Sequence, residues 1–275
     1  MALVTAIVAV AIPRAAMAQT PLPGIGVVIM HGKGGSPARI VSSFASWLEE
    51  RGYFVANLEM PWSGNREYDV SVAAAESEVD AALRTLRDKG ARKVFVAGHS
   101  QGGLFALHFG GKYPVDGIVA IAPGGNVAGP VYRDKLGPAV QLARKLVAEG
   151  RGNEKAEFSD FESSKGTYPV VVAPATYLTW FDPGGAMNQM KAVRTMNPQV
   201  PVLYIVPTND YPGLLRIKRL MFDALPKNPL SRLYEPEAGH LDAPTASRDE
   251  IARWTAEVAD RPNPALQGAR AGGRP

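Results

Sequence analysis

The sequence KVFVAGHSQGG, residues 93–103, carries the clearest indication of the fold. An apolar run of strand length, residues 93–97, leads into a glycine-rich turn, and residues 104–112 continue with helical character. Ser100 stands at the centre of the turn, with Gly98 two positions before it and Gly102 two positions after it. This G-x-S-x-G pattern places a serine on a sharp strand-to-helix turn. Only small residues fit at the flanking positions, so we expect the Ser100 side chain to project clear of a sheet.

Strands and helices alternate on both sides of this turn. The chain has 275 residues, of which 46% are apolar, and this is enough for the core of one α/β domain. Apolar runs of strand length also lie at residues 25–30, 53–58, 117–121, 202–206 and 231–234. Helical patterns lie at about residues 36–51, 71–89, 213–224 and 246–259. The alternation predicts a parallel sheet with right-handed crossovers, flanked by helices.

The alternation breaks between residues 124 and 197, a region that we call the insertion. It contains a charged helical stretch at 140–149 and an aromatic, proline-interrupted run at 168–185. A gap this long between two sheet strands requires structure of its own. We therefore expect a core built from residues 24–123 and 198–260, with the insertion forming a cap.

The two ends of the chain differ from the rest in composition. Residues 1–18 are mostly apolar, too short to span a bilayer comfortably, and end in Ala16-Met17-Ala18. They predict a signal peptide cleaved after Ala18 and a periplasmic or secreted protein, although no basic residue precedes the apolar run and a buried helix is the alternative. Residues 261–275 are rich in Gly, Pro, Ala and Arg and predict a disordered tail.

Charge and cysteine content exclude some classes of protein. The net charge is +4, but Lys and Arg are scattered among nearly as many acids, so nucleic acid is not an expected partner. There is no cysteine, so disulfides do not stabilise the fold. No stable membrane insertion of the mature chain is expected, and the oligomeric state is left open.

A serine hydroxyl is a weak nucleophile until a base accepts its proton. The chain offers four histidines. His99 lies beside the serine and is expected to pack, His31 to hold its own loop, and His108 to lie within the helix after the turn. His240 follows the last predicted strand, where a loop returns over the carboxyl edge of the sheet, and it is the candidate base.

The acid that orients such a histidine should precede it and follow a strand. Asp210 lies shortly after the strand at 202–206 and is the candidate. Asp182 is the rival, but it belongs to the insertion, and Asp242 is too close in sequence to His240.

The glycine loop HGKGG, residues 31–35, follows the first strand. Such a loop can direct backbone N–H groups at a developing oxyanion. The N–H groups of Lys33 and Gln101 are the expected pair, and Gly34 is an alternative to Lys33. The loop lacks the ending of a phosphate-binding P-loop. The histidines show no paired ligand spacing, so neither a metal nor a cofactor is expected.

HGKGG, GHSQGG, Asp210 and GHLDAP, in this order, make the chain resemble the α/β-hydrolase superfamily over about residues 24–259. The resemblance implies a parallel-dominated sheet with Ser100, Asp210 and His240 at its carboxyl edge. It also implies a cap inserted after the strand at 117–121, which follows the helix at 104–112. The insertion lies at this place in the chain. Similar proteins commonly begin with two further strands, for which there is no room before Ile25, so we expect a short, mostly parallel sheet of about six strands.

The fold alone does not fix the reaction. The expected activity is hydrolysis of a small-molecule carboxylic ester through an acyl-enzyme on Ser100. An apolar substrate pocket is expected from the aromatic residues, with packing in the cap core as the alternative. The pocket candidates are Trp62, Tyr177, Trp180 and Phe181, accompanied by Leu178, Met187 and Met190. An acyltransferase or peptidase using the same residues and a non-catalytic binding protein are the competing hypotheses.

Overall fold

The structure is a computed structural model and describes residues 24–261. The predicted signal peptide, residues 1–18, lies outside the described residues, and so does the predicted tail apart from Arg261. Both therefore stay predictions, together with the expected location of the protein.

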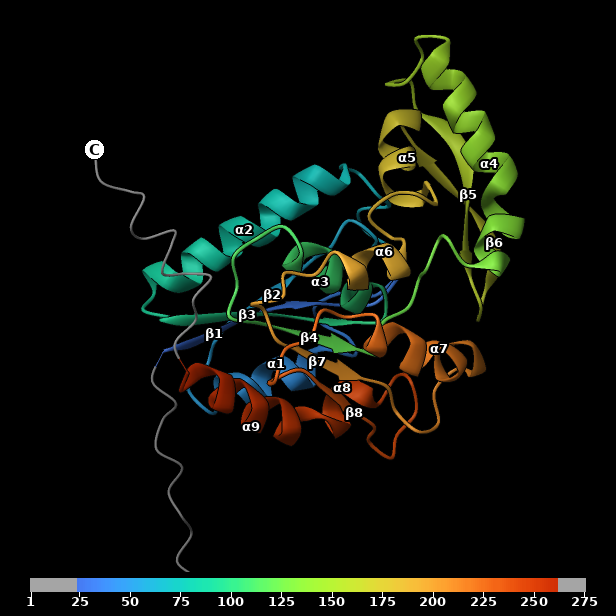
Figure 1. Cartoon of the computed structure of the whole chain (residues 1–275). Coiled ribbons are helices and arrows are strands. Elements are labelled where there is room, and N and C mark those ends of the chain that lie inside the picture. Colours follow the sequence, from blue (N-terminus) through green and yellow to red (C-terminus); the bar gives the residue numbers. More distant parts are fainter. Residues whose placement is uncertain (1–23, 262–275) are drawn as a thin grey trace, which may run out of the picture.

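A six-stranded parallel sheet forms the centre of the molecule, in the order β2-β1-β3-β4-β7-β8 (Figure 1). The strands are β1 (Ile25–Met30), β2 (Phe54–Leu58), β3 (Lys93–His99), β4 (Gly117–Ile121), β7 (Val202–Ile205) and β8 (Arg232–Tyr234). All carboxyl ends meet at one edge, so the loops that follow β1, β3, β7 and β8 can converge there. The short sheet expected from the sequence is confirmed.

Helices cover both faces of the sheet (Figure 1). One face packs against α2 (Val72–Asp88) and α3 (Gln101–Gly110), and the other against α1 (Ser42–Glu49) and α9 (Arg248–Ala259). The β1 side chains alternate between the two cores, with Val27 and Ile29 on the α1 side and Val28 and Met30 on the α2 side. A strand buried on both faces explains the continuous apolar run at residues 25–30.

Several helix boundaries differ from the prediction, among them that of the insertion helix predicted at 140–149, which begins at Pro130. The first helix begins at Ser42, because residues 36–41 form turns in which Pro37 O accepts a hydrogen bond from Asn57 Nδ2 at 2.9 Å. The final helix is divided at Ser247 into α8 (Ala243–Ala246) and α9. The helix α7 (Pro212–Asp223) lies after β7, close to its expected position.

The insertion leaves the sheet after β4 and returns at β7 (Figure 1). It contains α4 (Pro130–Ala148), β5 (Ala156–Glu162), β6 (Gly166–Val172), α5 (Pro174–Phe181) and α6 (Gln189–Arg194). The antiparallel hairpin of β5 and β6 is not among the predicted strands. Buried side chains of the insertion belong to the same hydrophobic cluster as those of α2 and α3, so the insertion packs on that side of the sheet.

Candidate active site

Ser100 occupies the sharp turn between β3 and α3. Its backbone has φ 55° and ψ −117°, and a positive φ is uncommon for a residue with a side chain. Ser100 N–H donates to Ile121 O at 2.8 Å, and Ser100 O accepts from Gly124 N–H at 3.0 Å. Such a conformation costs about 1–3 kcal/mol by itself, and these bonds to the neighbouring β4 region help to maintain it.

The flanking glycines are required by contact with main-chain atoms. A Cβ added to Gly98 would lie 2.1 Å from Gly102 O, and one added to Gly102 would lie 2.5 Å from Met30 O. Because both neighbours are backbone atoms, neither can yield as a flexible side chain would. These close contacts explain why glycine is needed on both sides of Ser100, as the G-x-S-x-G pattern predicts.

Two further glycines leave space beside the serine. A Cβ on Gly32 would lie 3.1 Å from Ser100 Cβ, and one on Gly124 would lie 3.5 Å from Ser100 Oγ. The hydroxyl makes no hydrogen bond to any residue between 24 and 261, the imidazole of His240 included. In unliganded enzymes the bond between nucleophile and base often tightens only when substrate is bound.

His240 and Asp210 are in direct contact. The distance from His240 Nδ1 to Asp210 Oδ1 is 2.7 Å, and both residues are buried. Nδ1–H therefore donates to the carboxylate, which fixes the tautomer and leaves Nε2 free to accept a proton. The ring of Tyr211 lies against the imidazole, with centroids 4.5 Å apart.

The loops after β7 and β8 bring these two residues together. Thr208 N–H donates to Pro236 O at 2.9 Å, and Asn209 N–H donates to Ala238 O at 3.1 Å. The two loops thus continue the parallel pairing of their strands beyond the sheet. This explains how residues separated by 30 positions meet at the carboxyl edge.

The rival carboxylates lie elsewhere. Asp182 pairs with Arg144 at 2.7 Å within the insertion, and although burial opposes it, the hydrogen bond from Arg144 lowers its pKa. Asp242 is exposed and directly precedes α8. Asp210 is therefore the carboxylate positioned to orient His240.

His99 packs under the site. Its Nε2–H donates to His240 O at 2.9 Å, so the residue before the serine holds the loop that carries the candidate base. Burial lowers the pKa of His99 to about 3, and the charge on His240 acts in the same direction. The His99 ring is therefore neutral and contributes geometry, not proton transfer.

His31 and His108 also have structural contacts. His31 Nδ1–H donates to Gly32 O at 2.7 Å, and its Nε2 accepts from Met60 N–H at 3.0 Å. Burial lowers the pKa of His31, consistent with this neutral form. His108 contacts Glu76 at 2.6 Å, on the side of α3 that faces α2. Neither ring contacts His240 or Ser100.

The structure separates the two alternatives for the oxyanion loop. Gly34 N–H donates to Trp62 O at 2.9 Å and is already engaged. Gln101 is the first residue of α3, where N–H groups have no acceptor within the helix. Lys33 and Gln101 therefore stay the candidate pair. The buried Lys33 side chain has a role that the sequence did not indicate, because its Nζ lies 2.5 Å from Asp160 Oδ1 in β5.

The aromatic residues expected to line a substrate pocket are deeply buried. Trp62, Tyr177, Trp180 and Phe181 are each at most 2% exposed. Trp62 packs against Trp180 with ring centroids 5.7 Å apart, and Trp180 Nε1 donates to Val70 O at 2.8 Å. This burial favours the alternative interpretation, in which they form the core between the insertion and α2. Phe181 also borders a cavity of about 200 Å³ beside α4.

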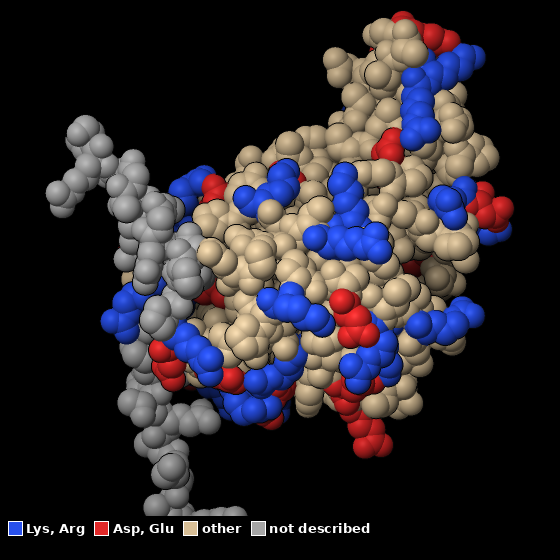
Figure 2. Space-filling model, in the orientation of Figure 1, with Lys and Arg blue, Asp and Glu red and all other residues tan. Residues whose placement is uncertain are grey.

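Three further features concern surface charge, possible metal ligands and the length of the apolar helices. Lys and Arg are interspersed with Asp and Glu on the face drawn in Figure 2. Within residues 24–261, no group of three His, Cys, Asp or Glu side chains is arranged to hold a metal ion. None of the helices in the described part of the chain is both long and apolar enough to cross a membrane.

Comparisons with known proteins bear on the family and the fold. A model of the alpha/beta hydrolase family matches residues 27–254. Similar solved structures include a monoacylglycerol lipase from Paleococcus ferrophilus, with 22% identity, a TM-score of 0.59, and coverage of 85% of this chain and 94% of that one. A thermostable carboxyl esterase from Bacillus coagulans, in complex with glycerol, has 13% identity, a TM-score of 0.58, and coverage of 86% and 90%.

A structure from work on two metagenome-derived lipolytic enzymes has 19% identity, a TM-score of 0.58, and coverage of 87% of this chain and 95% of that one. No curated protein sequence matches the chain. At these identities the solved structures show a shared fold and nothing finer. The family model spans most of the chain and includes Ser100, Asp210 and His240. The chain belongs to the alpha/beta hydrolase family.

Proposed function

We propose that this protein is a serine hydrolase that cleaves carboxylic esters through an acyl-enzyme on Ser100. The observation that carries the proposal is the combination of a serine held at φ 55° with a buried His240 whose Nδ1 lies 2.7 Å from Asp210. Family membership and lipolytic and esterase structures with the same fold support it.

In the proposed reaction, Ser100 Oγ attacks the ester carbonyl carbon while His240 Nε2 accepts the hydroxyl proton. The N–H groups of Lys33 and Gln101 bind the oxyanion of the tetrahedral intermediate. His240 then gives the proton to the departing alcohol, and the acyl group stays on Ser100. Water, deprotonated by His240, attacks the acyl carbon; the bond to Ser100 Oγ breaks, Oγ takes the proton back from His240, and the carboxylic acid is released. Asp210 keeps the imidazole oriented and stabilises its positive form.

A fluorophosphonate probe tests the nucleophile, and p-nitrophenyl esters of increasing acyl length test the substrate class. We expect the wild-type protein to be labelled and to hydrolyse the esters, and Ser100→Ala to lose labelling and at least about 10³-fold in kcat. The matched control is Ser77→Ala, an exposed helix serine whose hydroxyl bonds Ala73 O in the same helix. Labelling that persists in Ser100→Ala would contradict the assignment.

A further inference from the structure

A buried polar cluster links the loop after β1 to the insertion. Its centre is Asp160 of β5, which is 0% exposed. Asp160 Oδ1 accepts hydrogen bonds from Lys33 Nζ at 2.5 Å and from Phe161 N–H at 2.6 Å. Oδ2 accepts from the hydroxyls of Tyr68 at 2.8 Å and Tyr168 at 2.9 Å. A buried carboxylate is stable only when its lone pairs are satisfied in this way.

The protonation states in the cluster suit its contacts. Burial alone would lower the pKa of Lys33, but the charge of the adjacent Asp160 and its hydrogen bond raise it above the ordinary value. Burial and the same carboxylate raise the pKa of Tyr68 and of Tyr168. Lys33 is therefore a cation, and both phenols keep the protons that they donate.

The cluster reaches both candidate oxyanion residues. The Lys33 side chain bonds Asp160 directly. The Gln101 side chain reaches Asp160 through one intermediate, because Gln101 Nε2 donates to Tyr68 OH at 3.4 Å and Tyr68 OH donates to Asp160. The two main-chain N–H groups that we assign to the oxyanion thus belong to residues whose side chains attach to the same carboxylate.

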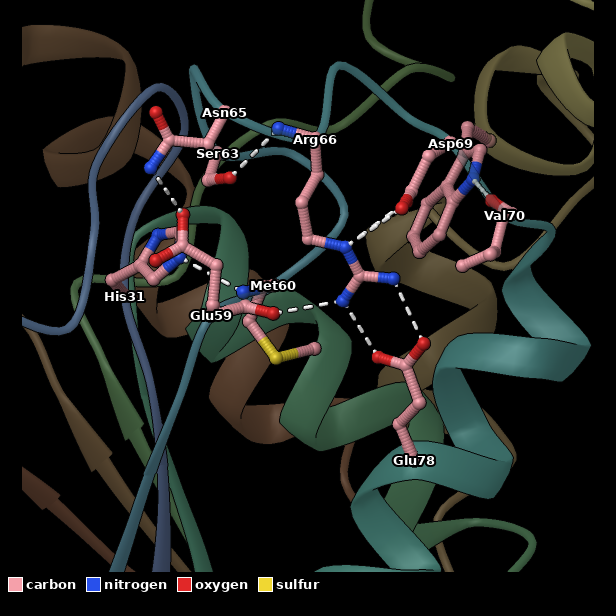
Figure 3. Close-up of polar contacts among 10 residues, drawn as sticks. His31, Glu59, Met60, Ser63, Asn65, Arg66, Asp69, Val70 and Glu78 are labelled. Carbon is pink, nitrogen blue, oxygen red and sulfur yellow. Dashed lines mark hydrogen bonds and ion pairs between the residues drawn. The ribbon is translucent and has the colours of Figure 1, made fainter.

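The loop that carries Tyr68 is firmly held (Figure 3). Tyr68 has φ 60°, an unusual value for an aromatic residue, and its N–H donates to Pro61 O at 2.6 Å. Figure 3 shows Arg66 between Asp69 and Glu78. Its guanidinium donates to both carboxylates and to Glu59 O at 2.8 Å. This clamp fixes the backbone on either side of Tyr68, and backbone strain of this kind persists only where the surroundings enforce it.

We propose that Asp160 is a positioning residue for the oxyanion hole, which it aligns through Lys33 on one side and through Tyr68 and Gln101 on the other. The proposal rests on the proposed function, since it needs an oxyanion to form at Ser100. Oxyanion donors act only when they lie within hydrogen-bonding distance of the oxygen in the transition state, so a small displacement of either loop weakens catalysis. The insertion thereby contributes to catalysis through a residue that does not touch substrate.

Two tyrosine variants form a matched test. Tyr68→Phe and Tyr168→Phe each remove one hydroxyl that donates to Asp160 Oδ2, but Tyr68 also contacts Gln101. We expect Tyr68→Phe to lower kcat about tenfold with KM unchanged, a fraction of the loss caused by deleting one oxyanion donor. Tyr168→Phe should stay within about twofold of wild type, because the Gln101 contact remains.

A trifluoromethyl ketone that carries the acyl group of the best ester supplies the second readout. It forms a tetrahedral adduct on Ser100 whose oxyanion occupies the hole, so its inhibition constant should rise in Tyr68→Phe by the same factor as kcat falls. Gln101→Met breaks the same contact from the other end and should reproduce both changes. Melting temperatures of the variants report any loss of folding separately.

Unchanged kcat and unchanged inhibition constants in both Tyr68→Phe and Gln101→Met, or a change in KM alone, would overturn the positioning role while leaving the serine hydrolase assignment intact. If Tyr68→Phe fails to fold, Gln101→Met decides between the two results. A wild-type protein that neither reacts with fluorophosphonate nor hydrolyses esters would overturn the proposed function, and the positioning role with it.

Discussion

Two buried aspartates, Asp210 and Asp160, show how differently the same side chain is used in this molecule. Asp210 Oδ1 accepts from His240 Nδ1 and from Tyr211 N–H, while its Oδ2 is buried without a partner among residues 24–261. Both oxygens of Asp160 are satisfied, and one faces the ammonium of Lys33. Asp160 thus faces the ammonium group of Lys33, whereas Asp210 faces the imidazole that serves as the base in the proposed reaction.

The partners of a buried carboxylate thus determine whether its loss affects catalysis or stability. Removing Asp210 should change the reaction first, because in the proposed mechanism this carboxylate orients His240 and stabilises its positive form. Removing Asp160 leaves a buried cation uncompensated, so it should change stability first.

The largest expected effect is the loss of kcat when Asp210 is replaced. Asp210→Asn keeps the shape but allows the imidazole to bind through its other tautomer, so kcat for ester hydrolysis should fall by about 10⁴-fold, with a melting temperature close to that of wild type. Steady-state kinetics and thermal unfolding measure the two quantities.

Asp182→Asn is the matched control for this change, since Asp182 is the rival acid in the insertion. Its ion pair with Arg144 is partly exposed, so we expect about 0–1 kcal/mol of lost stability and unchanged kcat. A comparable loss of kcat in Asp182→Asn would contradict the assignment of Asp210.

The second largest expected effect is the loss of stability when Asp160 is replaced. Asp160→Leu should lower the free energy of unfolding by about 3–5 kcal/mol, because Lys33 is left as an unpaired buried charge. Lys33→Met in the same chain removes that charge and should restore part of the loss. Urea unfolding of the two single variants and the double variant measures the coupling, and strictly additive losses would show that the pair is not energetically linked.

The contact between Asp210 and His240 could be predicted from the sequence because its signals are local. Gly98, Ser100 and Gly102 lie within one turn, and Gly98 is required by contact with Gly102 in that same turn, although Gly102 itself is required by contact with Met30 O of β1. Asp210 and His240 are each placed by the strand just before them, so the order of elements was enough to bring them to one edge.

The contacts of Asp160 were not predicted from the sequence, because they join residues that are far apart in the chain. Lys33 and Asp160 are 127 residues apart, and nothing in the HGKGG pattern indicates that the lysine side chain points toward the insertion. The hairpin that carries Asp160 contains Pro169 and few continuous apolar positions, and it pairs only with itself. The composition of the insertion also could not distinguish aromatic residues that line a pocket from those that form a core, and Trp180 is almost fully buried.

The smallest expected effect is a pH dependence of stability, which arises from His99 beside His240 and not from the cluster around Asp160. His99, which bonds the main chain of His240, has its pKa lowered from 6.5 to about 3 in the folded protein, chiefly by burial. Above pH 6.5 the ring is neutral in both the folded and unfolded states and contributes no pH dependence. Between that pH and about 3 only the unfolded chain binds the proton, so stability falls as pH falls, by up to about 1.4 kcal/mol per pH unit. Lys33 has a raised pKa and is charged throughout this pH range, so its titration adds no pH dependence to the stability there.

His99→Gln tests this acid sensitivity, because the amide can still donate to His240 O but does not titrate. Urea unfolding at pH 7 and pH 5 should show a smaller loss of stability on acidification in the variant than in the wild-type protein. The remaining pH dependence includes His31, whose pKa is also lowered by burial. An identical pH dependence in the two proteins would mean that His99 is accessible to protons in the folded state. The imidazole of His99 would then not hold the His240 loop in the way that its buried hydrogen bond indicates.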